Sequence, residues 1–230
     1  MADEEKDVPR SEIDQQAFPD ELAVLPVRDT VLFPHAVMPL NIGRESSKTL
    51  VDSLGENKLL AVVAQRDPSV EAPSPDELYR IGCVAVIHKS VRMPNNSLLI
   101  FCEGLARIQL TELVSQQPFY RFHYKKLPDE EPAPTAEIEA LRQNAISVFD
   151  DVVQLSPALS GDMQTMVQNI GEVGRVADFI AATLPGLSSA EKQTILETAD
   201  VQQRLEDIGR YLNKEREVLQ LRNKIQTQVQ

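Results

Sequence analysis

The sequence contains no tryptophan, only two cysteines among 230 residues, and no apolar run near the ~20 residues that a membrane-spanning helix needs. The cysteines, Cys83 and Cys102, lie in apolar strand-like runs and lack zinc-site spacing, so we expect two buried apolar residues. The acidic first residues have no apolar segment typical of a secretory signal. We therefore expect a cytoplasmic protein without a membrane segment, and this location disfavours a disulfide.

Catalytic motifs are missing as well. The chain has no G-x-x-x-x-G-K-[ST], G-x-G-x-x-G, H-E-x-x-H or G-x-S-x-G pattern. Its three histidines, His35, His88 and His123, lie far apart in the sequence, which argues against a shared metal or catalytic role. We predict no catalytic, cofactor-binding or metal-binding residue in this chain.

The net charge of −12 is unevenly distributed. Residues 1–21 carry −6 and residues 128–200 carry −10, whereas residues 22–127 and 201–230 carry +2 each. An acidic protein repels nucleic-acid phosphates unless basic residues cluster. Arg121, Lys125 and Lys126 stand beside aromatic residues, so an RNA-facing strand remains an alternative, but we favour a solvated charged face.

The spacing of apolar residues changes across an acidic, proline-rich stretch. Before it they recur mainly every 2 residues, which is typical of strands, and after it every 3.6 residues, which is typical of helices. This change predicts an α+β protein with four parts: a disordered acidic leader (1–20), a β-rich subdomain (21–127), a linker (128–136) and a helical bundle (137–230). The bundle is expected to end in a long helix.

The β-rich part reads as about six strands and one helix, and we expect a small closed or partly closed barrel. Pro39 marks an edge strand or bulge, and Gly104 a bulge or barrel corner. The clearest strand pair is a hairpin around Pro94–Ser97. The remaining expected elements are a helix at 45–55 opened by a serine near its N-cap, a buried strand at 59–65, and a strand at 119–127 with one aromatic face.

Helices are expected after the linker, with Ser188 and Glu191 forming a capping box and Asp200 capping the last helix. That helix carries two apolar sets that are out of phase, which predicts two different packing partners. The first set is Val201, Leu205, Ile208 and Leu212, and the second is Val218, Leu221 and Ile225. No stop signal precedes Gln230, so the helix is expected to continue beyond it.

The most specific stretch is LPVRDTVLFPHAVMPLNIGR, residues 25–44. It resembles the opening of the N-terminal domain of the Lon family of ATP-dependent proteases. The similarity continues in the strand from Tyr79 to Ile87, in the turn formed by Glu103, Gly104 and Arg107, and at Pro118–Tyr120. The matching residues of the opening stretch are Leu25, Pro26, Arg28, Asp29, Val31, Phe33, Pro34, Pro39, Leu40, Ile42, Gly43, Arg44 and Ser47.

The resemblance implies a PUA-like barrel within a non-catalytic region that recognises unfolded, damaged or regulatory proteins. The parent protein would be a homohexameric, stress-related serine protease with a Ser-Lys dyad. ATP and magnesium would bind an ATPase domain that is absent from this chain and that follows the long helix. The partners would be protein substrates and the parent's own domains.

We take Met93, Pro94 and Phe33 as candidate substrate contacts. Methionine beside a turn is adaptable and suits contacts with many apolar partners, although Met93 packed beneath the hairpin is the competing interpretation. Two rival functions remain open. One is a free-standing adaptor such as a ubiquitin-ligase substrate receptor, disfavoured where it requires more cysteines, and the other is a PUA-like RNA-binding module.

Overall fold

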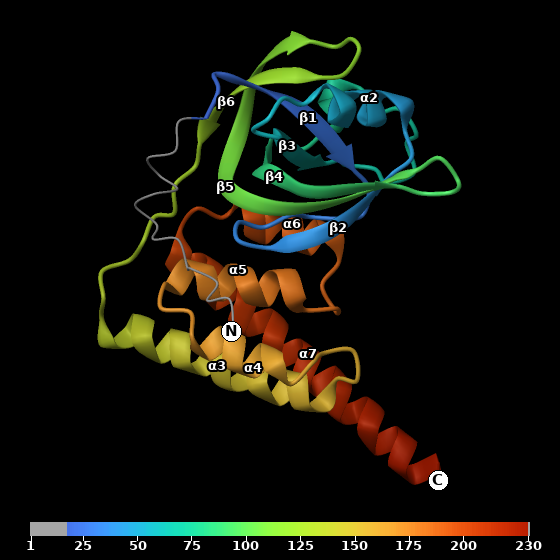
Figure 1. The fold of residues 1–230 in the computed structure, drawn as a ribbon. Helices are drawn as coiled ribbons and strands as arrows, with labels where there is room; N and C mark the ends of the chain where they lie inside the picture. The colour runs from blue at the N-terminus through green and yellow to red at the C-terminus, as the bar shows by residue number, and fades with distance from the viewer. Residues whose placement is uncertain (1–17, 230) are drawn as a thin grey trace, which may run out of the picture.

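The structure is a computed structural model that describes residues 18–229. A curved sheet forms one layer and a group of helices forms the other (Figure 1). The strands are β1 (Glu21–Val27), β2 (Val37–Ile42), β3 (Leu59–Ala64), β4 (Ile81–Arg92), β5 (Leu98–Ser115) and β6 (Arg121–Lys126). The helices are α2 (Glu45–Ser53), a 3₁₀ turn (Pro75–Glu77), α3 (Ala136–Leu155), α4 (Asp162–Gln168), α5 (Val173–Thr183), α6 (Ser189–Glu197) and α7 (Val201–Val229). The predicted α+β class is confirmed.

The sheet closes on itself. Its strand order is β2-β5-β4-β3-β1-β6, and β6 also pairs with β5, so five strands form a ring to which β2 is attached through β5. Among the strand pairs of the described chain, only β1–β3 is parallel, in the register Val24 to Ala61 and Leu25 to Val62. Among the described residues, β2 pairs with β5 alone, which agrees with the edge position that Pro39 predicted.

The strands at the centre of the sheet are buried on both faces, which explains their uninterrupted apolar sequences. Leu25 and Val62 join the larger apolar cluster, and their neighbours Val24 and Ala61 join a smaller one on the opposite face. The larger cluster also contains Phe149 of α3 and Leu205 of α7. Sheet and helices therefore share one core.

Gly104 marks a β-bulge, as its sequence context predicted. Ala85 pairs with Gly104 but Val84 pairs with Ala106, so Leu105 is the extra residue of β5. The Gly104 N–H donates to the Ala36 carbonyl oxygen, and its own carbonyl accepts from the His35 N–H. The bulge therefore anchors the segment between β1 and β2.

Helix ends in the second half follow the sequence closely. The Thr135 hydroxyl caps α3, the Ser188–Glu191 capping box opens α6, and Asp200 Oδ1 accepts from the Gln203 N–H at the start of α7. The serines predicted near the start of α2 lie in its first turn, close to the N-cap but not at it. The N-cap of α2 is Arg44, which makes no side-chain capping bond.

The two segments predicted to lie outside the folded parts make contacts where the structure describes them. The predicted leader falls mostly on residues 1–17, outside the described range. Residues 18–20 lie against β6, because Tyr124 donates to the Pro19 carbonyl at 2.5 Å and Lys126 Nζ lies 4.6 Å from the Phe18 ring. In the predicted linker, Glu130 forms a β-bridge with Asp200.

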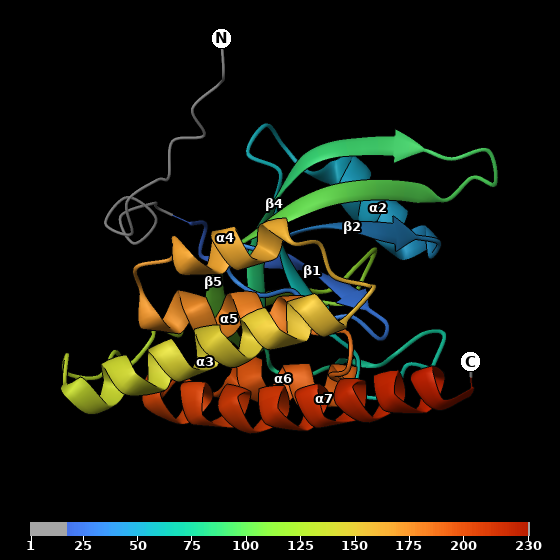
Figure 2. The same ribbon diagram turned by 90° about the horizontal axis from the view of Figure 1, so that it is seen from below.

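The two apolar sets of α7 lie in different environments, and within the described residues the structure shows packing only for the first, so the second packing partner stays a prediction. Val201, Leu205, Ile208 and Leu212 are at most 1% exposed. Val218, Leu221 and Ile225 are 45%, 60% and 53% exposed. The last turns run past the other helices (Figures 1 and 2).

Candidate functional site

The β4–β5 hairpin projects from the sheet in both ribbon views (Figures 1 and 2). Its tip is a β-turn closed by the Asn96 N–H, which donates to the Met93 carbonyl at 2.9 Å. Asn96 has φ +64°, a conformation that asparagine tolerates well. Asn95 Oδ1 accepts from both the backbone and the hydroxyl of Ser97. The tip is therefore held in one shape by its own polar groups.

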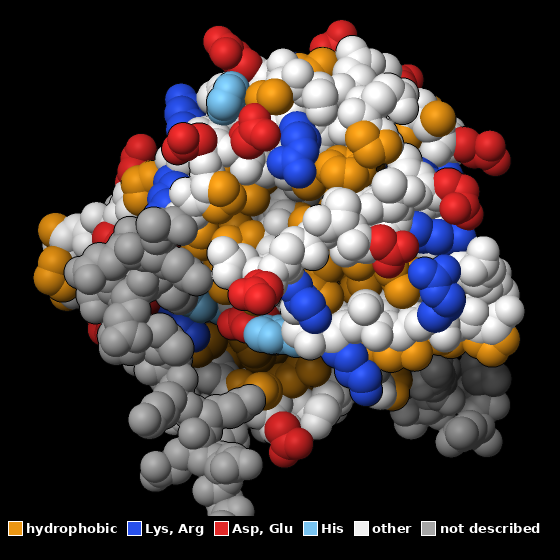
Figure 3. All heavy atoms as spheres, turned by 45° about the horizontal axis from the view of Figure 1, so that its top comes forward, with side chains coloured by type: hydrophobic (Ala, Val, Ile, Leu, Met, Phe, Trp, Pro, Cys, Tyr) orange, Lys and Arg blue, Asp and Glu red, His pale blue; other side chains and the backbone are white. Residues whose placement is uncertain are grey.

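The three candidate contacts occupy different environments. Met93 is 38% exposed at the hairpin tip, near Val91 at 36%, and Pro94 is exposed. Phe33 is fully buried in the core shared by sheet and helices, so it offers no surface to a partner in this conformation. The reason is the β5 bulge, which holds the segment after Phe33 against the sheet. On the face shown in Figure 3, hydrophobic side chains lie in hollows between charges of both signs.

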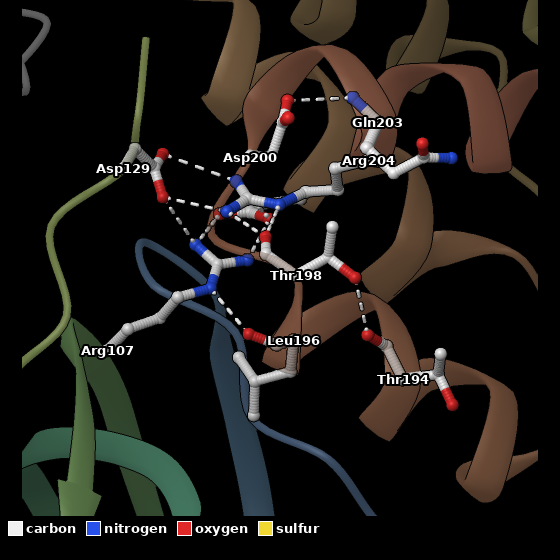
Figure 4. Close-up of polar contacts among 9 residues, drawn as sticks. Arg107, Asp129, Thr194, Leu196, Thr198, Asp200, Gln203 and Arg204 are labelled. Atoms are coloured by element: carbon white, nitrogen blue, oxygen red, sulfur yellow. Dashed lines mark hydrogen bonds and ion pairs between the residues drawn. The ribbon is translucent and has the colours of Figure 1, made fainter.

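A buried group of four charged side chains joins the sheet to the helices, and the sequence analysis did not anticipate it (Figure 4). Its members are Arg107 of β5, Asp129 of the segment between β6 and α3, Asp178 of α5 and Arg204 of α7. We call this group the ion cluster. Arg107 Nη1 lies 2.8 Å from Asp178 Oδ2 and 3.2 Å from Asp129 Oδ1. Arg204 Nη2 lies 2.8 Å from Asp129 Oδ1.

The ion cluster is electrically balanced and hydrogen-bonded on its remaining donors. Arg107 and Arg204 side chains are 2% and 0% exposed. Arg107 Nε donates to the Leu196 carbonyl and Arg204 Nε to the Thr198 carbonyl, each at 2.9 Å. Burial on its own would lower the pKa of Arg107, but the charge and hydrogen bonding of Asp178 together with the charge of Asp129 outweigh it and raise the pKa. The cluster therefore fixes the sheet's orientation on the helices.

A groove of about 950 Å³ opens elsewhere on the sheet, and no sequence motif indicated it. β1 and β2 line it together with the start of α2. Two loops complete its walls, one at 71–73 and the other at 116–120. Much of the resemblance stretch, residues 25–44, is thus the lining of this groove.

His35 is a residue whose ionisation should affect stability. Burial, and then Arg175, lower the pKa of His35 below its usual value, against the opposing charges of Asp178, Glu172 and Glu103. The unfolded chain then binds this proton more readily than the folded one. The stability that neutral His35 contributes is present above about pH 6.5 and is lost as the pH falls through the lower folded pKa.

We expect His35→Asn to lose less stability than the wild type between neutral pH and pH 5.5, measured by urea unfolding. Asparagine suits this position because His35 has φ +65°. His123→Asn, at an exposed histidine, is the matched control. Equal losses for His35→Asn and the wild type would contradict this assignment.

The basic strand β6 has partners of its own. Arg121 lies 3.5 Å from Glu21, and Lys126 lies over Phe18. These contacts favour the solvated charged face over an RNA-facing one. Cys83 and Cys102 are free and buried, as predicted, and burial raises their pKa values to about 12 and about 11.

The family described as the ATP-dependent protease La (LON) substrate-binding domain matches residues 21–214. The chain belongs to this family. It is 53% identical over 217 residues to the Lon protease of Koribacter versatilis and 41% identical over 215 residues to that of Dictyoglomus thermophilum. These alignments cover 94% and 93% of this chain but 27% of each relative. The chain thus spans about a quarter of the length of these relatives.

Solved structures agree with this assignment to the Lon substrate-binding domain at the level of the fold. The N-terminal domain of the Mycobacterium avium complex Lon protease superposes with a TM-score of 0.70 at 21% identity, over 84% of this chain and 98% of that one. A Lon N-terminal domain protein from Xanthomonas campestris superposes with a TM-score of 0.58 at 17% identity, over 82% of this chain and 96% of that one. Within residues 18–229, no helix combines the length and apolarity needed to span a bilayer.

Proposed function

We propose that this Lon substrate-binding domain receives unfolded or damaged proteins for an ATP-dependent serine protease, and that the β4–β5 hairpin tip makes the first contact. The observation that carries the proposal is the exposed Met93 on a hairpin that projects from the sheet, in a chain of this family. An exposed apolar side chain on a rigid support can bind many partners, because the hydrophobic effect is non-directional.

The parent protein is part of this proposal. It would be a cytoplasmic homohexamer that acts in protein quality control and stress response, with ATP and magnesium bound in an ATPase domain outside this chain. Relatives named Lon protease are about four times as long as the aligned region, which supports such an arrangement. We also assign the closed sheet to the PUA-like barrel type, on the basis of its ring of five strands.

Substitution of the hairpin methionine tests the proposal. We expect the wild type to bind reduced, carboxymethylated α-lactalbumin, a permanently unfolded protein, more tightly than native α-lactalbumin. Met93→Asp should weaken the first interaction about tenfold, because burying a methionine side chain contributes about 1.5–3 kcal/mol. Fluorescence anisotropy of the labelled lactalbumin measures both affinities.

Met166→Asp is the matched control, because Met166 is 57% exposed on α4 and lies outside the hairpin. It should leave binding unchanged. Equal affinity for folded and unfolded lactalbumin would contradict the receptor function. Equal weakening by the two substitutions would instead show that the hairpin is not the contact.

A further inference from the structure

The groove is flanked by two strands that each have an edge without a strand partner in the described chain. β6 pairs with β1 only from Glu21 to Ala23, and the Val24 N–H donates to the Tyr120 carbonyl. Within the described chain, β1 from Leu25 onward therefore has β3 as its only strand neighbour. β2 pairs with β5 alone. Such edges offer backbone groups to an added strand, which is how extended peptides bind to many sheets.

Each of the two strands carries a proline that lines the groove, Pro26 in β1 and Pro39 in β2. Proline has no N–H to donate but keeps its carbonyl oxygen. The two prolines therefore hinder two copies of the chain from pairing continuously along these strand edges. It still leaves acceptors for a short peptide that needs only a few backbone bonds.

Part of the groove's lining is apolar. Leu25, Leu40, Leu50 and Phe119 line it, and all four belong to the shared core. Its volume of about 950 Å³ is at the upper end of the range typical of binding pockets, about 300–1,000 Å³. It therefore suits several side chains of an extended segment.

Positive charge concentrates at one part of the lining. Arg44 Nη2 donates to Gln65 Oε1 at 2.6 Å, but the buried Arg44 Nε has no hydrogen-bond partner among residues 18–229. Arg28 is exposed and makes one long contact, 3.5 Å to the Glu71 carbonyl. Burial and the charge of Arg28 lower the pKa of Arg44, so the two guanidiniums repel each other.

The acidic residues of the lining do not offset this charge fully. Glu45 pairs with Lys48 at 2.8 Å, which leaves Glu71 beside the two arginines. A carboxylate entering the groove beside Arg28 and Arg44 would relieve the repulsion between the two guanidiniums.

We propose that the groove binds an extended internal segment of an unfolded protein, with apolar side chains inside and one aspartate or glutamate side chain facing Arg28 and Arg44. This inference rests on the proposed function and names the substrate feature that the domain prefers. A side-chain carboxylate is favoured over the chain end because an unfolded protein has one C-terminus but many internal segments.

The test uses a short peptide of valine, leucine and threonine with one central glutamate, a neutral fluorophore at the N-terminus and an amidated C-terminus. Its counterpart has glutamine in place of glutamate. We expect the wild type to bind the glutamate peptide roughly fivefold more tightly, the upper range for a partly exposed ion pair. Arg28→Gln should abolish this preference, and the exposed Arg210→Gln on α7 should keep it.

A second variant tests the groove itself. Ser46 is exposed on the lining, so Ser46→Trp should fill the opening and weaken both peptides by at least about fivefold, with an unchanged circular dichroism spectrum. Equal binding of both peptides by the wild type, or full binding by Ser46→Trp, would overturn the proposal. A glutamine peptide with a free C-terminus that binds more tightly than the amidated glutamate peptide would also overturn it, because the groove would then bind the chain end.

The outcomes separate this inference from the proposed function. If unfolded α-lactalbumin binds and Met93→Asp weakens it while no peptide binds, the groove proposal fails and the receptor function stands. If the peptides behave as expected but folded and unfolded lactalbumin bind equally, the groove is a peptide site and the receptor function fails.

Discussion

Replacing Asp178 by alanine should destabilise the domain by about 3–5 kcal/mol, because it leaves a buried cation without its counter-charge. Arg107 and Arg204 would then share one carboxylate, Asp129, at a site where both guanidiniums are almost inaccessible to solvent. A loss of this size is a large fraction of the total stability of a typical domain, about 5–15 kcal/mol. Urea unfolding followed by circular dichroism measures it.

Two further variants show whether charge balance is the cause. Asp52→Ala, which removes the partner of Arg92 in an exposed pair 3.7 Å long, should cost no more than about 1 kcal/mol. The double substitution Arg107→Met with Asp178→Leu should be less destabilising than Asp178→Ala, since it leaves Arg204 and Asp129 balanced. A double variant that is less stable than the single one would contradict the electrostatic explanation.

The second large effect is expected at Gly104. Its backbone conformation is an ordinary one for any residue, since no glycine of the described chain has a positive φ. A methyl group there, however, would overlap the Phe33 carbonyl oxygen and approach Cys83 Sγ to 3.0 Å. We expect Gly104→Ala to cost about 1–3 kcal/mol or somewhat more, because backbone atoms cannot yield as a flexible side chain does.

Gly209→Ala is the matched control. Gly209 lies in α7, and a Cβ added there meets no atom within 4 Å. This substitution should stabilise the domain by up to about 1 kcal/mol, the usual difference between the two residues inside a helix. If both substitutions change the urea midpoint in the same direction, steric overlap at the bulge is not the deciding factor.

Features that depend on neighbours in the sequence were predictable. The hairpin turn, the capping box at Ser188 and the two faces of α7 follow from residues within a few positions of one another. The ion cluster was not, because Arg107 and Asp178 are 71 residues apart and each reads as an ordinary surface charge. Arg107 was noted only as part of a family-like turn.

The candidate substrate contacts show the same difference between features set by neighbouring residues and features set by distant ones. Met93 lies beside a local turn and is 38% exposed, which is one of the two alternatives that its flanking residues left open. Phe33 is buried by packing against distant segments, which its own flanking residues do not reveal. The groove arises from the relative placement of β1, β2 and two loops, so its lining residues were recognisable only as part of the stretch that resembles the Lon family, without a stated role.

The ion cluster couples rotation of the sheet to displacement of the exposed last turns of α7. Arg204 ties the packed half of α7 to the sheet through Asp129, so sheet and helix turn as one body. α7 packs in the shared core as far as Leu219 and runs about 37 Å from Arg204 to Val229, so a rotation of about 5° about the ion cluster displaces the far end by about 3 Å. A small tilt of the receiving surface is thereby converted into a displacement large enough to change side-chain contacts at the far end.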